Sequence, residues 1–296
     1  MIIRWRLDVR VLTVSFLDHI RICNDHDIDR YLPFQAAGRR VGWVERGLAE
    51  TLRGFADVFT ITASAVALDP GLSTFDARSS AMAEVARSLH ERGLVPGWHD
   101  ENVAVAPRFG TAPLFKLERS AAPLFGVTVL GVHVNGIVSA RDGLKMWTGR
   151  RSRNKSTYPG MLDNLCAGGV IYGHGVRETL IKEAGEEASI PKALAERAVP
   201  TGAITYCCAR DGGLRPDIIF AYDLELPADF EPAPGDDEIE DFSLRPIDEV
   251  IEIVRGSFDF KFNCNLVIID FLVRHGFITP DEPDYIQIVT GLNHEC

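Results

Sequence analysis

Three glutamates, Glu183, Glu186 and Glu187, have the residue type and spacing that chemistry with a metal ion requires. On a helix, with about 100° between successive residues, they fall within about a third of the circumference. Carboxylates at ~6 Å repel one another by roughly 2–3 kcal/mol per pair at an effective dielectric near 20. A hard divalent cation with oxygen ligands, Mg²⁺ or alternatively Mn²⁺, would offset that repulsion.

A glycine-rich segment precedes the glutamates. Its small residues let backbone carbonyls reach a metal and let a phosphate come close. Taken alone, an acidic helix face is more often simply solvated, and that alternative stays open. The glycines are Gly168, Gly169, Gly173 and Gly175.

The segment from Gly168 to Ile190 resembles the Nudix box of metal-dependent hydrolases that cleave diphosphates linked to another moiety. The box has the pattern G-x5-E-x7-R-E-U-x-E-E-x-G-U, in which U is aliphatic. The first glycine and the three acids of its second half match Gly168, Glu183, Glu186 and Glu187.

Three positions depart from the box. His174 replaces its first glutamate, Lys182 its arginine and Ser189 its last glycine. In the family, the replaced glutamate and arginine help to fix the geometry of the loop and helix. Glu178 precedes Lys182 by four residues, and we expect an ion pair between them to replace part of that support.

The resemblance implies roles for the acidic residues. We expect Glu186 and Glu187 to be the main metal ligands, helped by the Gly168 carbonyl. Glu183 is either a further ligand or the general base. A second acidic run, GDDEIED, offers Glu238 or Glu240 as an additional ligand or base, and we include Glu240 in the predicted metal set. An exposed acidic loop is an equally good interpretation of that run.

Candidate substrate-binding residues lie shortly before the box. Arg151 and Lys155 belong to a basic stretch that suits a diphosphate, although a basic surface turn is an equal alternative. Tyr158 is a candidate for stacking on a heteroaromatic ring, and Asp163 for accepting a hydrogen bond from an amino group. Packing and capping are the competing roles for these two residues.

The segment RRSRNKSTYPGMLDNLCAGG resembles a narrower group, the Nudix proteins related to thiamine pyrophosphokinase. The similarity extends over most of residues 30–286, and a lysine at the box arginine is usual in that group. The resemblance implies cleavage of thiamine diphosphate, or its oxidised or antimetabolite analogues, to the monophosphate and phosphate. A broader nucleoside-diphosphate or ADP-ribose-type hydrolase and a non-catalytic ligand-binding module remain alternatives.

Strand and helix patterns alternate along the chain, which predicts an α/β or α+β layered fold. The resemblance implies a Nudix α/β/α sandwich with a mixed sheet, preceded by a smaller α+β N-terminal domain. We expect the N-terminal domain at residues 1–120, the Nudix domain at 121–278 and a tail at 279–296. Two expected features are a hairpin within 31–44 and a pair of strands within 125–140.

Composition excludes several classes of function. The 296 residues carry a net charge of −11, which argues against a nucleic-acid partner and leaves a small diphosphate as the expected one. No apolar run is long enough for a membrane span. The six cysteines show no zinc spacing, so we expect free thiols in a reducing, cytoplasmic compartment. Members of the family are often dimers, and a homodimer stays open.

Overall fold

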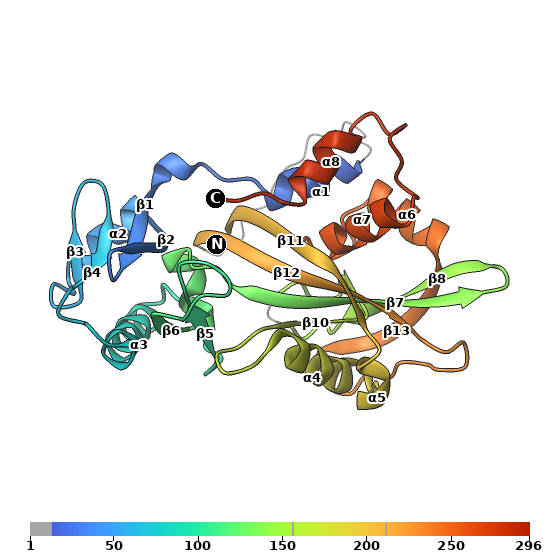
Figure 1. The fold of residues 1–296 in the computed structure, drawn as a ribbon, viewed down its shortest axis with the longest axis horizontal. Helices are drawn as coiled ribbons and strands as arrows, with labels where there is room; N and C mark the ends of the chain where they lie inside the picture. Colours follow the sequence, from blue (N-terminus) through green and yellow to red (C-terminus); the bar gives the residue numbers. More distant parts are fainter. Residues whose placement is uncertain (1–13, 156, 211) are drawn as a thin grey trace.

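The computed structural model describes residues 14–155, 157–210 and 212–296 (Figure 1). Its centre is a mixed sheet in which β11, β12, β7, β8 and β13 follow one another, with β10 paired to β7 and β9 to β8. Strands β12 and β7 run parallel, and the other neighbours are antiparallel. The strands are β7 (Leu130–Ala140), β8 (Gly143–Arg151), β9 (Leu162–Asp163), β10 (Cys166–Gly169), β11 (Val199–Arg210), β12 (Gly213–Glu225) and β13 (Ile239–Pro246).

Helices cover both faces of this sheet (Figure 1). The pleat of β12 shows why: Ile219 and Ala221 are buried in one apolar cluster, whereas Tyr222 and Leu224 are buried in another. The prediction of an α/β/α sandwich with a mixed sheet is therefore confirmed. One face carries α4 (Val176–Ala188) and α5 (Lys192–Ala195), and the other carries α1 (Phe16–Cys23), α6 (Ile247–Gly256), α7 (Cys264–Arg274) and α8 (Tyr285–Gly291).

A smaller α+β region precedes the sandwich, as expected, and has its own apolar cluster formed by residues from Leu32 to Val127. Its four-stranded sheet has the order β2-β1-β4-β3, and β5 pairs with β6. The predicted hairpin is confirmed as β1 and β2. The elements are η1 (Ile28–Arg30), β1 (Tyr31–Ala36), β2 (Arg39–Glu45), α2 (Arg46–Leu52), β3 (Phe59–Ile61), β4 (Val66–Leu68), α3 (Phe75–Glu91), β5 (Asn102–Val105), β6 (Phe115–Glu118) and η2 (Arg119–Phe125).

Two features of the fold were not expected from the sequence. The expected strand pair within 125–140 is wrong, because β7 is one strand. It follows the 3₁₀ helix η2, which is capped by Gly126 with a left-handed φ of 52°. Helices α1 and α8 both contribute to the apolar cluster of the sandwich. Residues near both ends of the described chain therefore pack together, beside the sheet.

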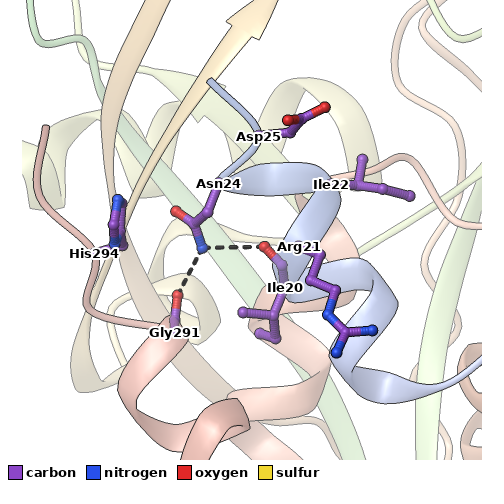
Figure 2. A pocket seen from close by; sticks show the side chains of 7 residues that line it. All are labelled: Ile20, Arg21, Ile22, Asn24, Asp25, Gly291 and His294. Atoms are coloured by element: carbon purple, nitrogen blue, oxygen red, sulfur yellow. Dashed lines mark hydrogen bonds between the residues drawn. The ribbon is translucent and has the colours of Figure 1, made fainter. Parts of the chain in front are cut away.

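Asn24 joins three of these elements. Its side-chain amide donates to the carbonyls of Ile20 and Gly291, each at 3.0 Å, at a pocket between α1 and the end of α8 (Figure 2). The side-chain oxygen of Asn24, Oδ1, accepts a hydrogen bond from the backbone N–H of Cys207 on β11 at 3.2 Å. One half-buried amide thus joins both helices to the edge of the sheet.

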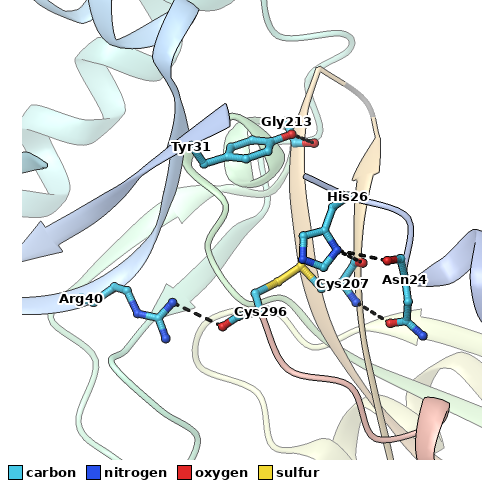
Figure 3. The surroundings of a disulfide bond; sticks show 7 residues. All are labelled: Asn24, His26, Tyr31, Arg40, Cys207, Gly213 and Cys296. Carbon is cyan, nitrogen blue, oxygen red and sulfur yellow. Dashed lines mark hydrogen bonds between the residues drawn. A yellow bond between two sulfur atoms is a disulfide. The ribbon is translucent and has the colours of Figure 1, made fainter. Parts of the chain in front are cut away.

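The expectation that all six cysteines are free thiols is wrong for two of them. Cys207 and Cys296 form a disulfide with a Cα–Cα distance of 5.7 Å (Figure 3). The backbone leading to Cys296 runs along β11, where His294 N donates to Thr205 O at 3.0 Å. The chain pairing brings the two cysteines together across 89 residues, which spacing alone does not reveal. No helix in the described part of the chain is long and apolar enough to cross a membrane.

Glycines let η2 fit tightly between the N-terminal sheet and the sandwich. A Cβ on Gly213 would lie 2.9 Å from Leu124 N and still closer to the Pro123 carbonyl, and a Cβ on Gly42 would lie 2.8 Å from Gly126 O. Both obstacles are backbone atoms, which cannot rotate away as a side chain would.

We therefore expect Gly213→Ala to lower the free energy of unfolding by about 3 kcal/mol or more, because the backbone of η2 must shift. Gly256→Ala is the matched control, since a Cβ there meets nothing within 4 Å. Urea unfolding of the two variants checks the expectation, and equal midpoints for both would contradict it.

Candidate functional site

Strand β10 and helix α4 position the glycine segment and the three glutamates. β10 pairs with β7, and the chain then leaves the sheet and enters α4 after Gly175. The Glu178 carboxylate accepts from Gly175 N at 3.3 Å and caps the first turn. Leu180, Ala184 and Ala188 are buried against the sheet, which fixes the rotation of the helix.

Helix α4 ends at Ser189, where the box has glycine. Ser189 has a left-handed φ of 54°. A residue with a side chain pays about 1 kcal/mol or more for that conformation. Ser189 therefore carries some local strain at the end of the helix.

Glu187 is buried, with 5 % of its surface exposed. Its Oε2 accepts a hydrogen bond from Ala167 N on β10 at 2.9 Å. Burial, followed by the charge of Asp163, raises its pKa well above the ordinary value. An ionised Glu187 therefore needs a nearby positive charge, and a divalent cation would supply one.

Glu183 lies directly over Gly168. A Cβ on Gly168 would sit 2.6 Å from Glu183 Oε1, so only glycine allows this contact. Burial raises the pKa of Glu183, although the adjacent ammonium of Lys182 opposes the shift. The structure thus places one carboxylate beside the backbone of the glycine that begins the box.

Glu186 is the most exposed of the three glutamates and pairs with Lys182 at 2.6 Å. Lys182 Nζ also lies 3.3 Å from Glu183 Oε1. The predicted pair of Lys182 with Glu178 is wrong, because Lys182 turns toward the acids, while Glu178 caps Gly175 and lies 3.8 Å from His174 Nδ1. The hydrogen bond with Glu186 raises the pKa of Lys182. The positive charge of Lys182 offsets the repulsion between the carboxylates of this face.

The donor set fits a hard cation by its chemistry. It offers carboxylate oxygens and a backbone carbonyl. Glu187 is buried and Glu183 is partly buried, and burial raises the pKa of both carboxyl groups. In the described residues the three glutamates do not bring one oxygen each to within 4.8 Å of the others. Glu186 must leave Lys182 to join a shared ion.

Glu238 and Glu240 differ in where they point. Glu238 pairs with Lys155 at 2.7 Å and interacts electrostatically with both Glu183 and Glu187. Burial would raise its pKa, but the hydrogen bond and charge of Lys155 outweigh burial and lower it. Glu240 instead accepts from Arg153 N at 3.0 Å. The geometry therefore favours Glu238 over Glu240 as the additional acid.

Arg151 and Asp163, both candidates for substrate contact, are buried as a pair beneath the site. Their ion pair measures 2.8 Å, and Lys261 Nζ lies 3.6 Å from the same carboxylate oxygen. Arg151 also donates to the carbonyls of Thr157 and Tyr158. These contacts are internal, so the structure does not present either side chain to a substrate.

Two further buried side chains lie around this carboxylate. Cys264 Sγ donates to Asp163 Oδ1 at 2.7 Å, and His133 Nδ1 donates to Asn164 Oδ1 at 2.8 Å. His133, Asp163 and Cys264 bring potential metal ligands within 4.8 Å of one another. The cations Arg151 and Lys261 already neutralise Asp163, which disfavours a metal ion there.

Tyr158 and Lys155 complete the set of predicted substrate residues. The Tyr158 hydroxyl accepts from Arg210 Nη1 at 2.9 Å, and its ring lies 5.4 Å from that of Phe262. Lys155 remains partly exposed beside Glu238. Lys155 is thus the candidate that pairs with an acid of the site, Glu238, and is still partly exposed.

Sequence reasoning missed Arg119, whose guanidinium lies against the glycine segment. Its Nη1 would be 3.5 Å from a Cβ placed on Gly169. Arg119 precedes the box by some fifty residues in another part of the fold, and no local pattern marks it. Lys261 was missed for the same reason.

Comparisons with known proteins bear on the identity of this site. A family model described as a domain of unknown function, DUF4743, matches residues 15–129. Nudix hydrolase 20 of Arabidopsis thaliana, named as chloroplastic, is 41% identical over 295 residues, which cover 95% of this chain and 79% of that protein. The chain belongs to the Nudix hydrolase family.

A second relative agrees with this assignment. Nudix hydrolase 24 of Arabidopsis thaliana, also named as chloroplastic, is 42% identical over 288 residues, covering 95% of this Nudix hydrolase and 79% of the relative. Among solved structures, the Nudix domain of Shewanella oneidensis NrtR, complexed with ADP-ribose, has a TM-score of 0.41 and 13% identity, over 51% of this chain and 90% of that one. The assignment rests on the two sequence relatives.

The buried network predicts how stability of this Nudix hydrolase depends on pH. Burial, with the charge of Lys261, lowers the pKa of His133 to about 4. An unfolded histidine has a pKa of about 6.5, so the unfolded state binds more protons between these values. Stability from His133 is complete above pH ~6.5 and falls as the pH drops toward 4, by about 3 kcal/mol in all.

We expect His133→Asn, which keeps a donor for Asn164, to lack this dependence. Its deficit relative to wild type should then shrink by about 3 kcal/mol between pH 7 and pH 4. Urea unfolding across this range measures the effect, with the exposed His99→Asn as control. Parallel stability curves for wild type and His133→Asn would refute it.

Proposed function

We propose that this Nudix hydrolase uses Mg²⁺, or Mn²⁺ in its place, to cleave thiamine diphosphate or its oxidised or antimetabolite analogues to the monophosphate and phosphate. The observation that carries the hydrolytic part is the seating of Glu183 on Gly168 and of Glu187 on Ala167 N. Two acids are thereby held beside the backbone of β10, and open space remains around Gly173 and Gly175 further along the segment. The choice of substrate is supported by the resemblance of the stretch before the box.

The residues divide the work of hydrolysis as follows. Glu186, Glu187 and the Gly168 carbonyl would hold the cation, with Glu238 as a further acid. A bound divalent cation supplies positive charge that offsets the charge of the phosphate oxygens as the P–O bond breaks. Lys155 lies where it can exchange Glu238 for a phosphate oxygen.

Glu183 is suited to take a proton from the attacking water. Its raised pKa lies closer to the operating pH than that of an ordinary glutamate. A general base works best with such a pKa, because it is then ionised and also accepts a proton readily. The water oxygen bonds to phosphorus, the bridging P–O bond breaks, and the leaving phosphate or monophosphate carries the electron pair. Glu183 then releases its proton to solvent through its partly exposed carboxylate.

A panel of diphosphates with Mg²⁺ tests the substrate. Phosphate release from thiamine and oxythiamine diphosphates, without attack on ADP-ribose, is the expected result. Cleavage of ADP-ribose or nucleoside diphosphates at comparable kcat/KM would favour the broader hydrolase instead. Binding without turnover under either divalent ion would favour a ligand-binding module.

For Glu186→Gln we expect a loss of turnover of ~10²-fold or more, because a ligand that supports charge development is removed. The fold should persist, since Glu186 is half exposed and its partner is Lys182. Calorimetry with Mg²⁺ should show weaker binding in parallel. Glu196→Gln is the control, because Glu196 is an exposed acid that pairs with Lys192. Near-normal activity of Glu186→Gln would show that Glu186 is not a metal ligand.

A further inference from the structure

The N-terminal region touches the glycine segment of the box directly. Tyr172 N, within the loop, donates to Asn102 O on β5 at 2.7 Å. The Tyr172 ring stacks on Phe75 of α3 with centroids 5.4 Å apart, and Lys116 Nζ lies 5.7 Å from the ring centroid. The loop that follows β10 is therefore held from outside the sandwich.

Arg119 brings a cation to the same loop. It begins η2, and its backbone N donates to Glu101 O at 2.8 Å, which fixes where its side chain starts. The guanidinium pairs with Glu101 at 2.8 Å and lies against Gly169, with Nη1 at 3.5 Å and Cδ at 3.7 Å from a Cβ placed there. The glycine removes the side chain that would separate Arg119 from the loop.

Arg119 also acts electrostatically on one acid of the site. Its positive charge acts on Glu238, together with those of Lys155 and Arg151. Lys155 comes from the sandwich and pairs with Glu238, whereas Arg119 comes from the N-terminal region and acts on the same carboxylate through its charge. A diphosphate has two phosphoryl groups, and each needs a positive partner in addition to the metal ion.

The present partners of these cations are side chains that are partly exposed, and Glu101 Oε2, the oxygen nearest Arg119, is buried without a hydrogen-bond partner among the described residues. The Arg119 and Glu101 side chains are 32% and 36% exposed, and those of Lys155 and Glu238 are 26% and 45% exposed. Ion pairs at such partly exposed positions stabilise a protein by about 0–1 kcal/mol. Arginine binds phosphate through two parallel hydrogen bonds, which are charge-assisted and stronger.

We propose that Arg119 of the N-terminal region binds a phosphoryl group of the substrate, so that this region completes the active site of the Nudix sandwich. The inference rests on the proposed diphosphate hydrolysis. Glu101 acts as the placeholder for the phosphate: it holds the guanidinium in position and releases it on binding. The rival role is structural, with the Arg119–Glu101 pair merely attaching the N-terminal region to the loop.

The two roles predict opposite signs for one variant. We would measure the affinity of methylenediphosphonate, a diphosphate analogue that cannot be hydrolysed, by calorimetry with Mg²⁺. If Arg119 binds phosphate, Arg119→Gln weakens binding by about tenfold or more, whereas Glu101→Gln removes a competing carboxylate and tightens binding a few-fold. If the pair is structural, both variants loosen the loop and shift affinity in the same direction.

Arg53→Gln is the control for a lost charge, because Arg53 pairs with Glu50 on the surface of the N-terminal region. Arg119→Lys keeps the charge without the fork and should fall between wild type and Arg119→Gln. Thermal melts accompany every titration, so that a variant with impaired folding is recognised. If Arg119→Gln folds poorly, Arg119→Lys should still weaken the binding of methylenediphosphonate and Glu101→Gln should still tighten it. With a hydrolysed diphosphate, the same changes should appear mainly in KM.

The outcomes separate this inference from the proposed function. If wild type does not bind methylenediphosphonate with Mg²⁺, the diphosphate site itself is refuted and the role of Arg119 with it. If wild type binds and Arg119→Gln binds within twofold of it, or Glu101→Gln weakens binding as Arg119→Gln does, only the role of Arg119 is overturned.

Discussion

The site depends on one constraint: the acidic face of α4 packs against β10 so closely that carboxylates are buried beside backbone. Glu187 is held by Ala167 N, and Glu183 occupies the space that a side chain on Gly168 would fill. Buried like charges are unfavourable, and their raised pKa values express this. The apolar side of α4 must therefore hold the helix in place, and its burial in the core of the sandwich does so.

Below these acids lies a second layer of charge that is satisfied internally. Arg151 and Lys261 neutralise Asp163, and Cys264 donates to the same carboxylate. Breaking such a buried set by removing one partner leaves an uncompensated charge, which is costly. These contacts join β8, β9 and the start of α7 to one another beneath the site.

The N-terminal region contacts the sandwich close to the candidate site. Segment η2 fits against Gly42 on one side and Gly213 on the other, with backbone contacts that leave no room for a Cβ. The first residue of η2 is Arg119, which lies on the glycine segment of the box. The same close packing that holds η2 therefore also positions a cation at the glycine segment.

Sequence alone determined the features that depend on local order. The spacing of Glu183, Glu186 and Glu187 on one helix, the glycines before them and the alternation of strands and helices follow from residue type and period, because helix and strand geometry act over a few residues. The motif also indicated the family to which the two Arabidopsis relatives assign this chain.

Only the tertiary structure decided how distant residues combine. It turned Lys182 toward the acids, buried Arg151 with Asp163, brought Glu238 to the site in preference to Glu240, and joined Cys207 to Cys296. It also placed Arg119, from another part of the fold, beside Gly169. These contacts arise from sheet pairing and layer packing across long stretches of chain, so no pattern within a short window of sequence contains them.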